Sequence, residues 1–214
     1  MHVLITGAGR GIGKGLADAY SSAGAEVTAT ARGAEPPARL DVADPASVAD
    51  FAKRMDGRAI DLLICNAGIY PDKGQGLEEG FAPALWAETF AVNVTGVFLT
   101  IQALLPNLSL AQTPKIAIIG SQMGSNTRAP GGSYIYRASK SAVLNLGRNL
   151  AVDLKPRKIA VGIYHPGWVR TDMGGTTAEI TTAEAVSGLM ARFAELDLAR
   201  TGCFETWDGR DHPL

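Results

Sequence analysis

The chain of 214 residues is 46% hydrophobic and 19% charged, and its formal net charge is −1. This length allows one well-buried core without a second domain, and a charge near zero gives no electrostatic reason to expect a nucleic acid or an anionic membrane as partner. The two cysteines, Cys65 and Cys203, are too few and too scattered for a disulfide framework or a zinc site.

Short β-branched runs alternate with longer segments of helical periodicity along the whole chain. The predicted strands are His2–Thr6, Glu26–Ala31, a brief Arg39–Val42, Ile60–Cys65, Lys115–Gly120, Lys158–Tyr164 and, as a possible last one, Gly202–Trp207. The predicted helices are Ile12–Ala23, Pro45–Met55, Pro83–Leu105, Tyr134–Leu154 and Thr182–Leu196. Asp44 before Pro45 indicates a helix N-cap with proline at the first helical position, and Thr181 or Thr182 can cap the last helix.

This alternation predicts one α/β domain over residues 1–214, a parallel, doubly wound sheet with helices on both faces. Only eight residues separate Arg32 from Asp41, and they include two consecutive prolines. A crossover between parallel strands normally takes a dozen or more residues, so the one between the second and third strands is shortened and the third strand's place stays open. Without a signal-peptide pattern or a run of roughly 18 apolar residues, we expect a soluble, cytoplasmic protein.

The segment TGAGRGIGKG, Thr6–Gly15, follows the first predicted strand and opens the first predicted helix. It matches neither a P-loop nor the GxGxxG pattern; what fits is Gly7-x-x-x-Gly11-x-Gly13. Glycines let the backbone turn tightly and let a diphosphate approach the helix N-terminus, whose free N–H groups favour an anion. A merely tight turn would need only one or two glycines, so we interpret the segment as an anion site at the carboxyl edge of the sheet.

Four more motifs follow, each at its expected place in the alternation of strands and helices. Asn66–Gly68 (NAG) ends a strand, Asn93–Gly96 (NVTG) lies inside the long helix, YRASK places Tyr136 four residues before Lys140, and Pro166–Thr171 reads PGWVRT. Together with the glycine segment they resemble the short-chain dehydrogenase/reductase family, in order and from end to end. The block GGSYIYRASK and the tail WDGRDHP resemble most its small carbonyl-reductase-like branch, with the C-factor and sniffer-type proteins.

The resemblance implies a Rossmann-type fold and hydride transfer between a nicotinamide and a small carbonyl or alcohol, with no metal ion. By this resemblance, Tyr136 exchanges a proton with the substrate. Lys140 binds the hydroxyls of the nicotinamide ribose and tunes the acidity of Tyr136. Ser121 would hydrogen-bond the substrate oxygen, and Asn93 would anchor a water in the proton path.

The serine is the open point of this assignment. Family members commonly place it at the position that Met123 occupies here. We favour Ser121 because it comes directly after the strand Lys115–Gly120, at the catalytic edge of the sheet. Ser125 is the alternative.

The tyrosine–lysine pair also follows from elementary chemistry. Tyr136 and Lys140 are four residues apart and share a helix face, and a neighbouring ammonium lowers the pKa of a phenol, which is ordinarily about 10. Tyr134 cannot form this pair, since Ala138 stands four residues on. Both partners are expected to lie off the apolar stripe of their helix and to face a cleft. That stripe is predicted along Ile135, Ala138, Ala142, Leu146, Leu150 and Leu154.

The end of the second predicted strand indicates which nicotinamide cofactor binds. An acid there would accept hydrogen bonds from the ribose of NAD, whereas an arginine accommodates the 2′-phosphate of NADP. The strand ends in TATARG, with Arg32 and no acid, and Arg10 lies in the glycine segment. Charge-assisted contacts to phosphate are strong, so we interpret the two arginines as binding the 2′-phosphate of NADP(H). The alternative is that both are solvated surface charges.

The resemblance supplies the remaining cofactor contacts, among them Asp41 and Val42 for the adenine, and Val169 and Thr171 for the carboxamide. The predicted cofactor-binding residues are Gly7, Arg10, Gly11, Ile12, Gly13, Arg32, Asp41, Val42, Asn66, Ala67, Gly68, Tyr136, Lys140, Pro166, Val169 and Thr171.

The substrate pocket is expected between Tyr70–Leu85, Gln122–Ser133 and Trp168–Ile180, and its substrate is a small aldehyde, ketone or alcohol. An apolar, partly aromatic lining is predicted from Tyr70, Met123, Trp168 and Met173. In the first of these loops, Asp72, Glu78 and Glu79 are interpreted as a solvated edge. His165 is a possible second acid or base, although a histidine before Pro-Gly is more often structural.

Two other functions remain open at this point. An NADP-binding sensor or signalling protein would not need all four catalytic residues. An epimerase or dehydratase of the related extended fold would need more chain after Pro166 than is present. A homodimer or homotetramer is compatible with the sequence.

Overall fold

The computed structural model of the protein describes all of its residues, 1–214. Six strands form one sheet in which every neighbouring pair is parallel, in the order β2-β1-β3-β4-β5-β6. This confirms the predicted parallel sheet, including its possible last strand. The strands are β1 His2–Ile5, β2 Glu26–Ala29, β3 Leu62–Cys65, β4 Lys115–Ile119, β5 Ala160–His165 and β6 Phe204–Thr206.

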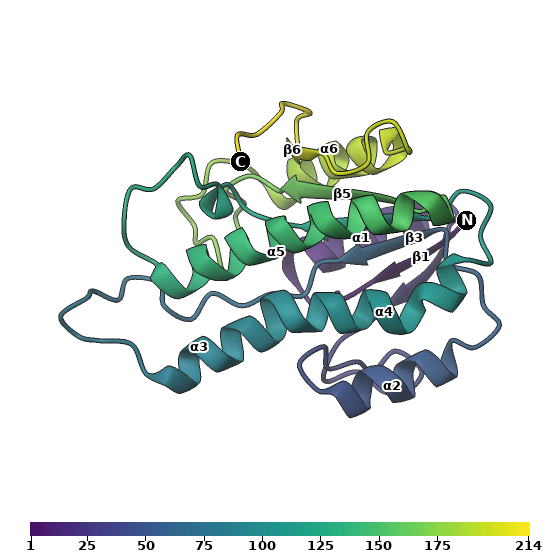
Figure 1. Ribbon diagram of the computed structural model, residues 1–214, viewed down its shortest axis with the longest axis horizontal. Coiled ribbons are helices and arrows are strands. Elements are labelled where there is room, and N and C mark those ends of the chain that lie inside the picture. The colour runs from purple at the N-terminus through teal and green to yellow at the C-terminus, as the bar shows by residue number, and fades with distance from the viewer.

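Helices cover both faces of this sheet (Figure 1). They are α1 Gly11–Ser22, α2 Pro45–Arg54, α3 Pro83–Phe90, α4 Gly96–Leu108, α5 Tyr134–Leu154 and α6 Thr182–Glu195. The larger hydrophobic core lies between the sheet and α2, α4 and α5, and a smaller core lies between the opposite face and α1 and α6. The fold is therefore doubly wound, as predicted.

Two helices begin at the residues that the sequence indicates. The Asp44 side chain accepts a hydrogen bond from the Ala46 N–H at 2.9 Å, and Pro45 occupies the first turn of α2. Thr181 caps α6 reciprocally with Glu184, whose carboxylate accepts from the backbone N–H of Thr181 at 2.8 Å. Such caps satisfy N–H groups that a helix start leaves unpaired, so local sequence determines both starts.

The prediction of a strand at Arg39–Val42 is wrong. Only one parallel bridge forms there, between Ala31 and Arg39, and no helix lies between β2 and α2. Because the segment is too short for a crossover, the chain turns back beside the end of β2 and continues into α2. The shortened connection is present, but it adds no strand to the sheet.

The predicted long helix Pro83–Leu105 is helical throughout, with an irregular turn in its middle. A π-helical turn, Ala91–Thr95, joins α3 to α4. Directly after it, a Cβ at Gly96 would lie 2.6 Å from the carbonyl oxygen of Val42, so only glycine allows this close approach. π-Helical turns are frequent at functional sites, and this one contains Asn93.

The whole stretch Pro83–Leu108 has the length and composition of a membrane-spanning helix, with a mean hydropathy of 1.5 over an 18-residue window. In the structure, 44% of that window is buried within the protein. Ile101, Leu104 and Leu108 belong to the larger core. The hydropathy of this stretch therefore agrees with its position as a core helix.

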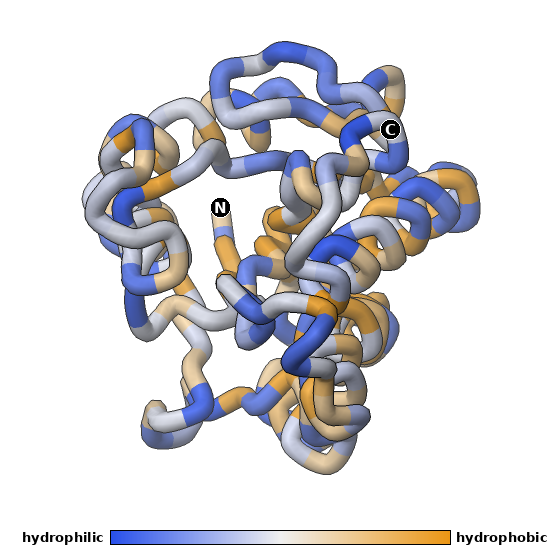
Figure 2. The backbone as a smooth tube through the Cα atoms, turned by 90° about the vertical axis from the view of Figure 1, so that its left-hand side faces the viewer, coloured by the Kyte–Doolittle hydropathy of each residue, from blue (hydrophilic) through white to orange (hydrophobic).

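The neighbouring strands β1 and β3 mark the point at which the chain reverses direction across the sheet. From β1 the chain proceeds to β2 on one side, and the later strands continue from β3 on the other. The loops after such diverging strands leave a crevice, which is where open α/β sheets bind ligands. Figure 2 looks onto this edge of the molecule.

Candidate active site

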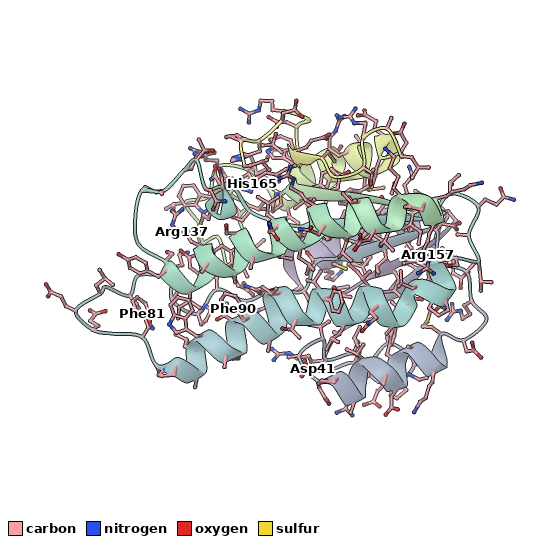
Figure 3. All side chains as sticks on the ribbon, in the orientation of Figure 1. Asp41, Phe81, Phe90, Arg137, Arg157 and His165 are labelled. Carbon is pink, nitrogen blue, oxygen red and sulfur yellow. The ribbon has the colours of Figure 1, made fainter.

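A cavity of about 730 Å³ lies at the carboxyl ends of these strands. Its size is in the usual range for a cofactor or small-molecule site. Asp41, one of the lining residues, lies next to α2 (Figure 3). The predicted cofactor-binding residues that line the cavity are Gly7, Arg10, Gly11, Ile12, Gly13, Arg32, Asp41, Val42, Asn66, Ala67, Gly68, Tyr136, Lys140, Pro166 and Thr171.

The glycine segment turns tightly because other backbone lies against it. Gly7 has a φ of +67°, and a Cβ there would lie 2.8 Å from the Cα of Ala67. At Gly13 a Cβ would lie 2.5 Å from the carbonyl oxygen of Gly7. No side chain caps the N-terminus of α1, so its first N–H groups remain available to an anion in the cavity.

Hydrogen bonds tie this turn to the end of β3. The Asn66 side-chain amide donates to the carbonyl oxygens of Thr6 and Gly7, both at 3.0 Å. In return, the Thr6 hydroxyl accepts from the backbone N–H groups of Asn66 at 3.0 Å and Ala67 at 3.1 Å. The two diverging strands are therefore fixed relative to each other at the site.

The two arginines predicted to hold a 2′-phosphate have different surroundings. Arg32 lines the cavity and takes part in no salt bridge. Arg10 donates to the Asp172 carboxylate at 2.8 Å, and both side chains are largely exposed. An exposed ion pair contributes little to the free energy of folding. Arg10 can therefore exchange Asp172 for a phosphate with little loss of stability.

The segment after β5 is shaped by its own polar contacts. The Thr171 hydroxyl accepts from the Gly174 N–H at 3.1 Å and donates to the Val169 carbonyl at 3.3 Å. Val169 is buried, pairs with Ile180 in a single bridge and does not line the cavity. Thr171 is thus held at the cavity wall, whereas Val169 lies behind it.

The expected buried stripe of α5 is right at its ends, Ile135 and Leu154, and wrong between them, whereas the expectation that Tyr136 and Lys140 face a cleft is confirmed. Tyr136 and Lys140 lie on the buried side of the helix, with only 8% and 5% of their surface exposed. Ala138, Ala142, Leu146 and Leu150, which the sequence assigns to that stripe, are only partly buried. The cause is close packing on the sheet at Gly147, where a Cβ would lie 2.7 Å from Ile163. The buried side is Ile135, Tyr136, Ser139, Lys140, Val143, Leu144, Gly147, Ala151 and Leu154.

The Lys140 ammonium is buried without a carboxylate partner. It donates one hydrogen bond, to the carbonyl oxygen of Ile119 at 2.9 Å, and lies 5.7 Å from the centre of the Tyr136 ring. An ammonium has three donors, so two remain for a ligand in the cavity. Burial lowers the pKa of Lys140 to about 8.

The Tyr136 phenol is protonated at neutral pH. Burial raises the pKa of its hydroxyl to about 12, the Ser121 hydroxyl acts to lower this pKa, and Tyr70 and Asp72 act to raise it further. The sequence predicts that Lys140 lowers this pKa; in the structure burial raises it instead, and Ser121 is the group that acts to lower it. Ser121 is the serine beside Tyr136, whereas the Ser125 hydroxyl is buried with no hydrogen-bond partner.

Asn93 connects three elements around this pair. Its amide nitrogen donates to the Ile69 carbonyl at 2.9 Å and to the Ser139 hydroxyl at 3.0 Å, and its oxygen accepts from the Ile69 N–H at 2.9 Å. Both N–H groups are therefore used within the protein. The Asn93 side chain holds the π-helical turn against the loop after β3 and against α5, and it does not line the cavity.

Residues 1–181 match the family model described as short chain dehydrogenase. The chain belongs to the short-chain dehydrogenase family. The C-signal of Myxococcus xanthus is 32% identical over 167 residues, which cover 76% of this chain and 98% of that protein.

Two solved structures resemble this short-chain dehydrogenase over its whole length. The NADPH-bound carbonyl reductase from chicken fatty liver has a TM-score of 0.88 at 28% identity, covering 100% of this chain and 98% of that one. The carbonyl reductase Sniffer of D. melanogaster has a TM-score of 0.89 at 26% identity, covering 100% and 99%. These similarities confirm the family and the branch that the sequence motifs indicate.

One loop prediction for this short-chain dehydrogenase is wrong. Asp72 is fully buried, not part of a solvated edge. Tyr70 stacks its ring on the ring of Tyr136 and lies outside the cavity lined by the cofactor-binding residues, so its place in a substrate pocket stays a prediction. His165 is buried outside the cavity, and burial lowers its pKa to about 4, so the ring is neutral.

Sequence reasoning also missed Thr6, Asp72 and Asp172 as site residues. Thr6 opens the glycine segment and Asp172 directly follows Pro166–Thr171, so their proximity to these motifs could have indicated them. Asp72 carried none, because its partners are backbone groups of a helix more than sixty residues further along the chain.

Proposed function

We propose that the protein is an NADP(H)-dependent oxidoreductase that interconverts a small carbonyl compound and its alcohol, with Tyr136 as the acid and base. One observation carries this proposal: a buried phenol and a buried ammonium with free donors open onto the same cavity as the uncapped start of α1. An ordinary core would leave neither a lysine nor a helix start unpaired in this way.

The residues around the cavity fit a nicotinamide dinucleotide phosphate. The glycine segment leaves room for a diphosphate at α1, Arg32 offers a free guanidinium for the 2′-phosphate, and Lys140 offers two donors for ribose hydroxyls. The NADPH-bound chicken carbonyl reductase, similar over the whole chain, supports the same cofactor.

The mechanism divides between cofactor and protein. When bound, NADPH supplies the hydride to the carbonyl carbon. The Tyr136 hydroxyl donates its proton to the carbonyl oxygen, and the Ser121 hydroxyl orients that oxygen by a hydrogen bond. The Lys140 ammonium stabilises the phenolate that Tyr136 becomes. Since the pKa of Tyr136 is about 12, the resting enzyme already holds the proton that reduction needs.

We expect kcat/KM for NADPH to fall as the pH rises through about 8. This parameter reports groups of the free enzyme, and the amine of Lys140, with a pKa of about 8, loses its charge there. The fold itself is not weakened, because the unfolded chain keeps this proton to higher pH and deprotonation above about pH 8 favours the folded state. A pH profile with parallel circular dichroism checks this; a flat profile between about pH 8 and pH 10 contradicts it.

A panel of aldehydes, ketones and quinones, with NADPH oxidation followed optically, tests the proposed function. We expect turnover of at least one carbonyl class, with NADPH preferred over NADH. The similarity to the M. xanthus C-signal keeps a signalling function as the second candidate. Tight NADPH binding with no turnover of any compound would favour that candidate.

A further inference from the structure

Helix α5 begins without a cap of its own. Ser133, at the N-cap position, has a φ of 50°, and its side chain makes no capping hydrogen bond. The backbone N–H groups of the first turn have no partners within a helix and need them from elsewhere. Tyr136 belongs to this first turn, so the partners of these groups bear on where its ring lies.

The partner is the buried carboxylate of Asp72. Its Oδ2 accepts from the Ile135 N–H at 2.8 Å, and its Oδ1 accepts from the Tyr136 N–H at 3.2 Å. Asp72 is fully buried and has no lysine or arginine partner. Only the helix N-terminus offsets its charge, by these hydrogen bonds and by the helix dipole.

Tyr70, two residues before Asp72, positions the side chain of Tyr136. The two rings stack with centroids 4.1 Å apart and an angle of 21° between their planes. The Tyr70 hydroxyl also hydrogen-bonds the Ser133 hydroxyl. Phe81, labelled in Figure 3, continues this contact by packing edge-on against Tyr134, with centroids 5.8 Å apart. The loop after β3 thus crosses the start of α5 and fixes both its backbone and its aromatic ring.

We propose that Asp72 is a positioning residue of the active site, which supplies the missing cap of α5 and thereby fixes Tyr136 against Ser121. This inference rests on the proposed function, because it assumes that Tyr136 transfers the proton. Asp72 itself does not line the cavity; it acts through the backbone of Tyr136, which does.

The charge of Asp72 gives the proposal a signature that a merely structural residue lacks. The ionisable groups facing Tyr136 are Tyr70, Asp72 and Lys140, and the carboxylate of Asp72 acts to raise the pKa of Tyr136. Asp72→Asn removes this charge and keeps one acceptor, so the pKa of Tyr136 should fall. The pH at which alcohol oxidation reaches half its maximum should fall with it.

The experiment compares Asp72→Asn and Asp72→Ala with the wild type. We expect kcat to fall by about a hundredfold in the alanine variant and by about tenfold in the asparagine variant, because small misplacement of a reacting group costs factors of this size. The NADPH Kd should stay within about twofold. Amide hydrogen exchange at Ile135 and Tyr136, measured without any cofactor, should accelerate by about tenfold or more.

Asp197→Asn is the matched control, since that exposed carboxylate also accepts from two backbone N–H groups, of Ala199 at 2.8 Å and Arg200 at 2.9 Å. It should leave kcat unchanged. The proposal is overturned if Asp72→Asn keeps both wild-type kcat and wild-type exchange, or if Asp197→Asn loses as much kcat. Should the wild type reduce no carbonyl compound, the proposed function alone fails, and exchange at Ile135 and Tyr136 still decides whether Asp72 caps the helix.

Discussion

Replacement of Tyr136 by phenylalanine is expected to lower kcat by about a hundredfold to ten-thousandfold, the usual contribution of a positioned acid or base. The change removes a single oxygen from a buried ring that stacks on Tyr70, so the packing around it stays filled. Cofactor affinity should remain near normal, because the glycine segment and Lys140 are untouched. Steady-state kinetics on the best carbonyl substrate, together with NADPH titration by fluorescence, provide the measurement.

Tyr134→Phe is the matched control for this change. Tyr134 stands on the same helix turn, but its side chain is exposed and does not line the cavity. It should retain wild-type kcat. If Tyr136→Phe also retained wild-type kcat, another group would have to donate the proton and the proposed mechanism would be wrong.

Replacement of Arg32 by alanine is expected to weaken NADPH binding by about tenfold to a hundredfold, the range for one charge-assisted hydrogen-bond partner. NADH lacks the 2′-phosphate, so its affinity should change by no more than about twofold. Because Arg32 has no competing carboxylate, its guanidinium is the one most available to the phosphate. Calorimetric titration of each variant with both nucleotides measures the difference.

Arg10→Ala is the natural comparison for Arg32→Ala. Arg10 must first release Asp172, so its loss should weaken NADPH binding less than the loss of Arg32. Equal losses for NADPH and NADH in Arg32→Ala would refute the contact with the 2′-phosphate. A larger effect at Arg10 would mean that Arg10, despite its ion pair with Asp172, is the stronger contact for NADPH.

Most of the fold could be predicted because its causes are local. Alternating β-branched and helical segments, together with caps at Asp44 and Thr181, determine where the strands and helices lie. The strand at Arg39–Val42 could not be judged in this way. Whether a segment forms a strand depends on a neighbour to pair with, and here the chain is too short to reach more than one bridge.

In the candidate site too, residues in local motifs could be predicted, whereas those that depend on packing could not. The glycines, Arg32, Tyr136 and Lys140 stand in motifs whose spacing carries the information, and the structure brings them around one cavity. The buried side of α5 depends on how closely Gly147 lets the helix approach the sheet, which periodicity alone does not contain. Asp72 was misjudged for a related reason: a carboxylate in a polar loop gives no sign that it will be covered.

The loss of the third strand also affects how the sheet ends. β2 is left as an edge strand, and such an edge offers unpaired backbone groups to strands of other chains. Here the edge is only four residues long, the Glu26–Arg58 ion pair at 2.5 Å places charge at its start, and the bridge between Ala31 and Arg39 follows just beyond its end. A short, charged edge of this kind leaves little room for a strand of another chain to pair with β2.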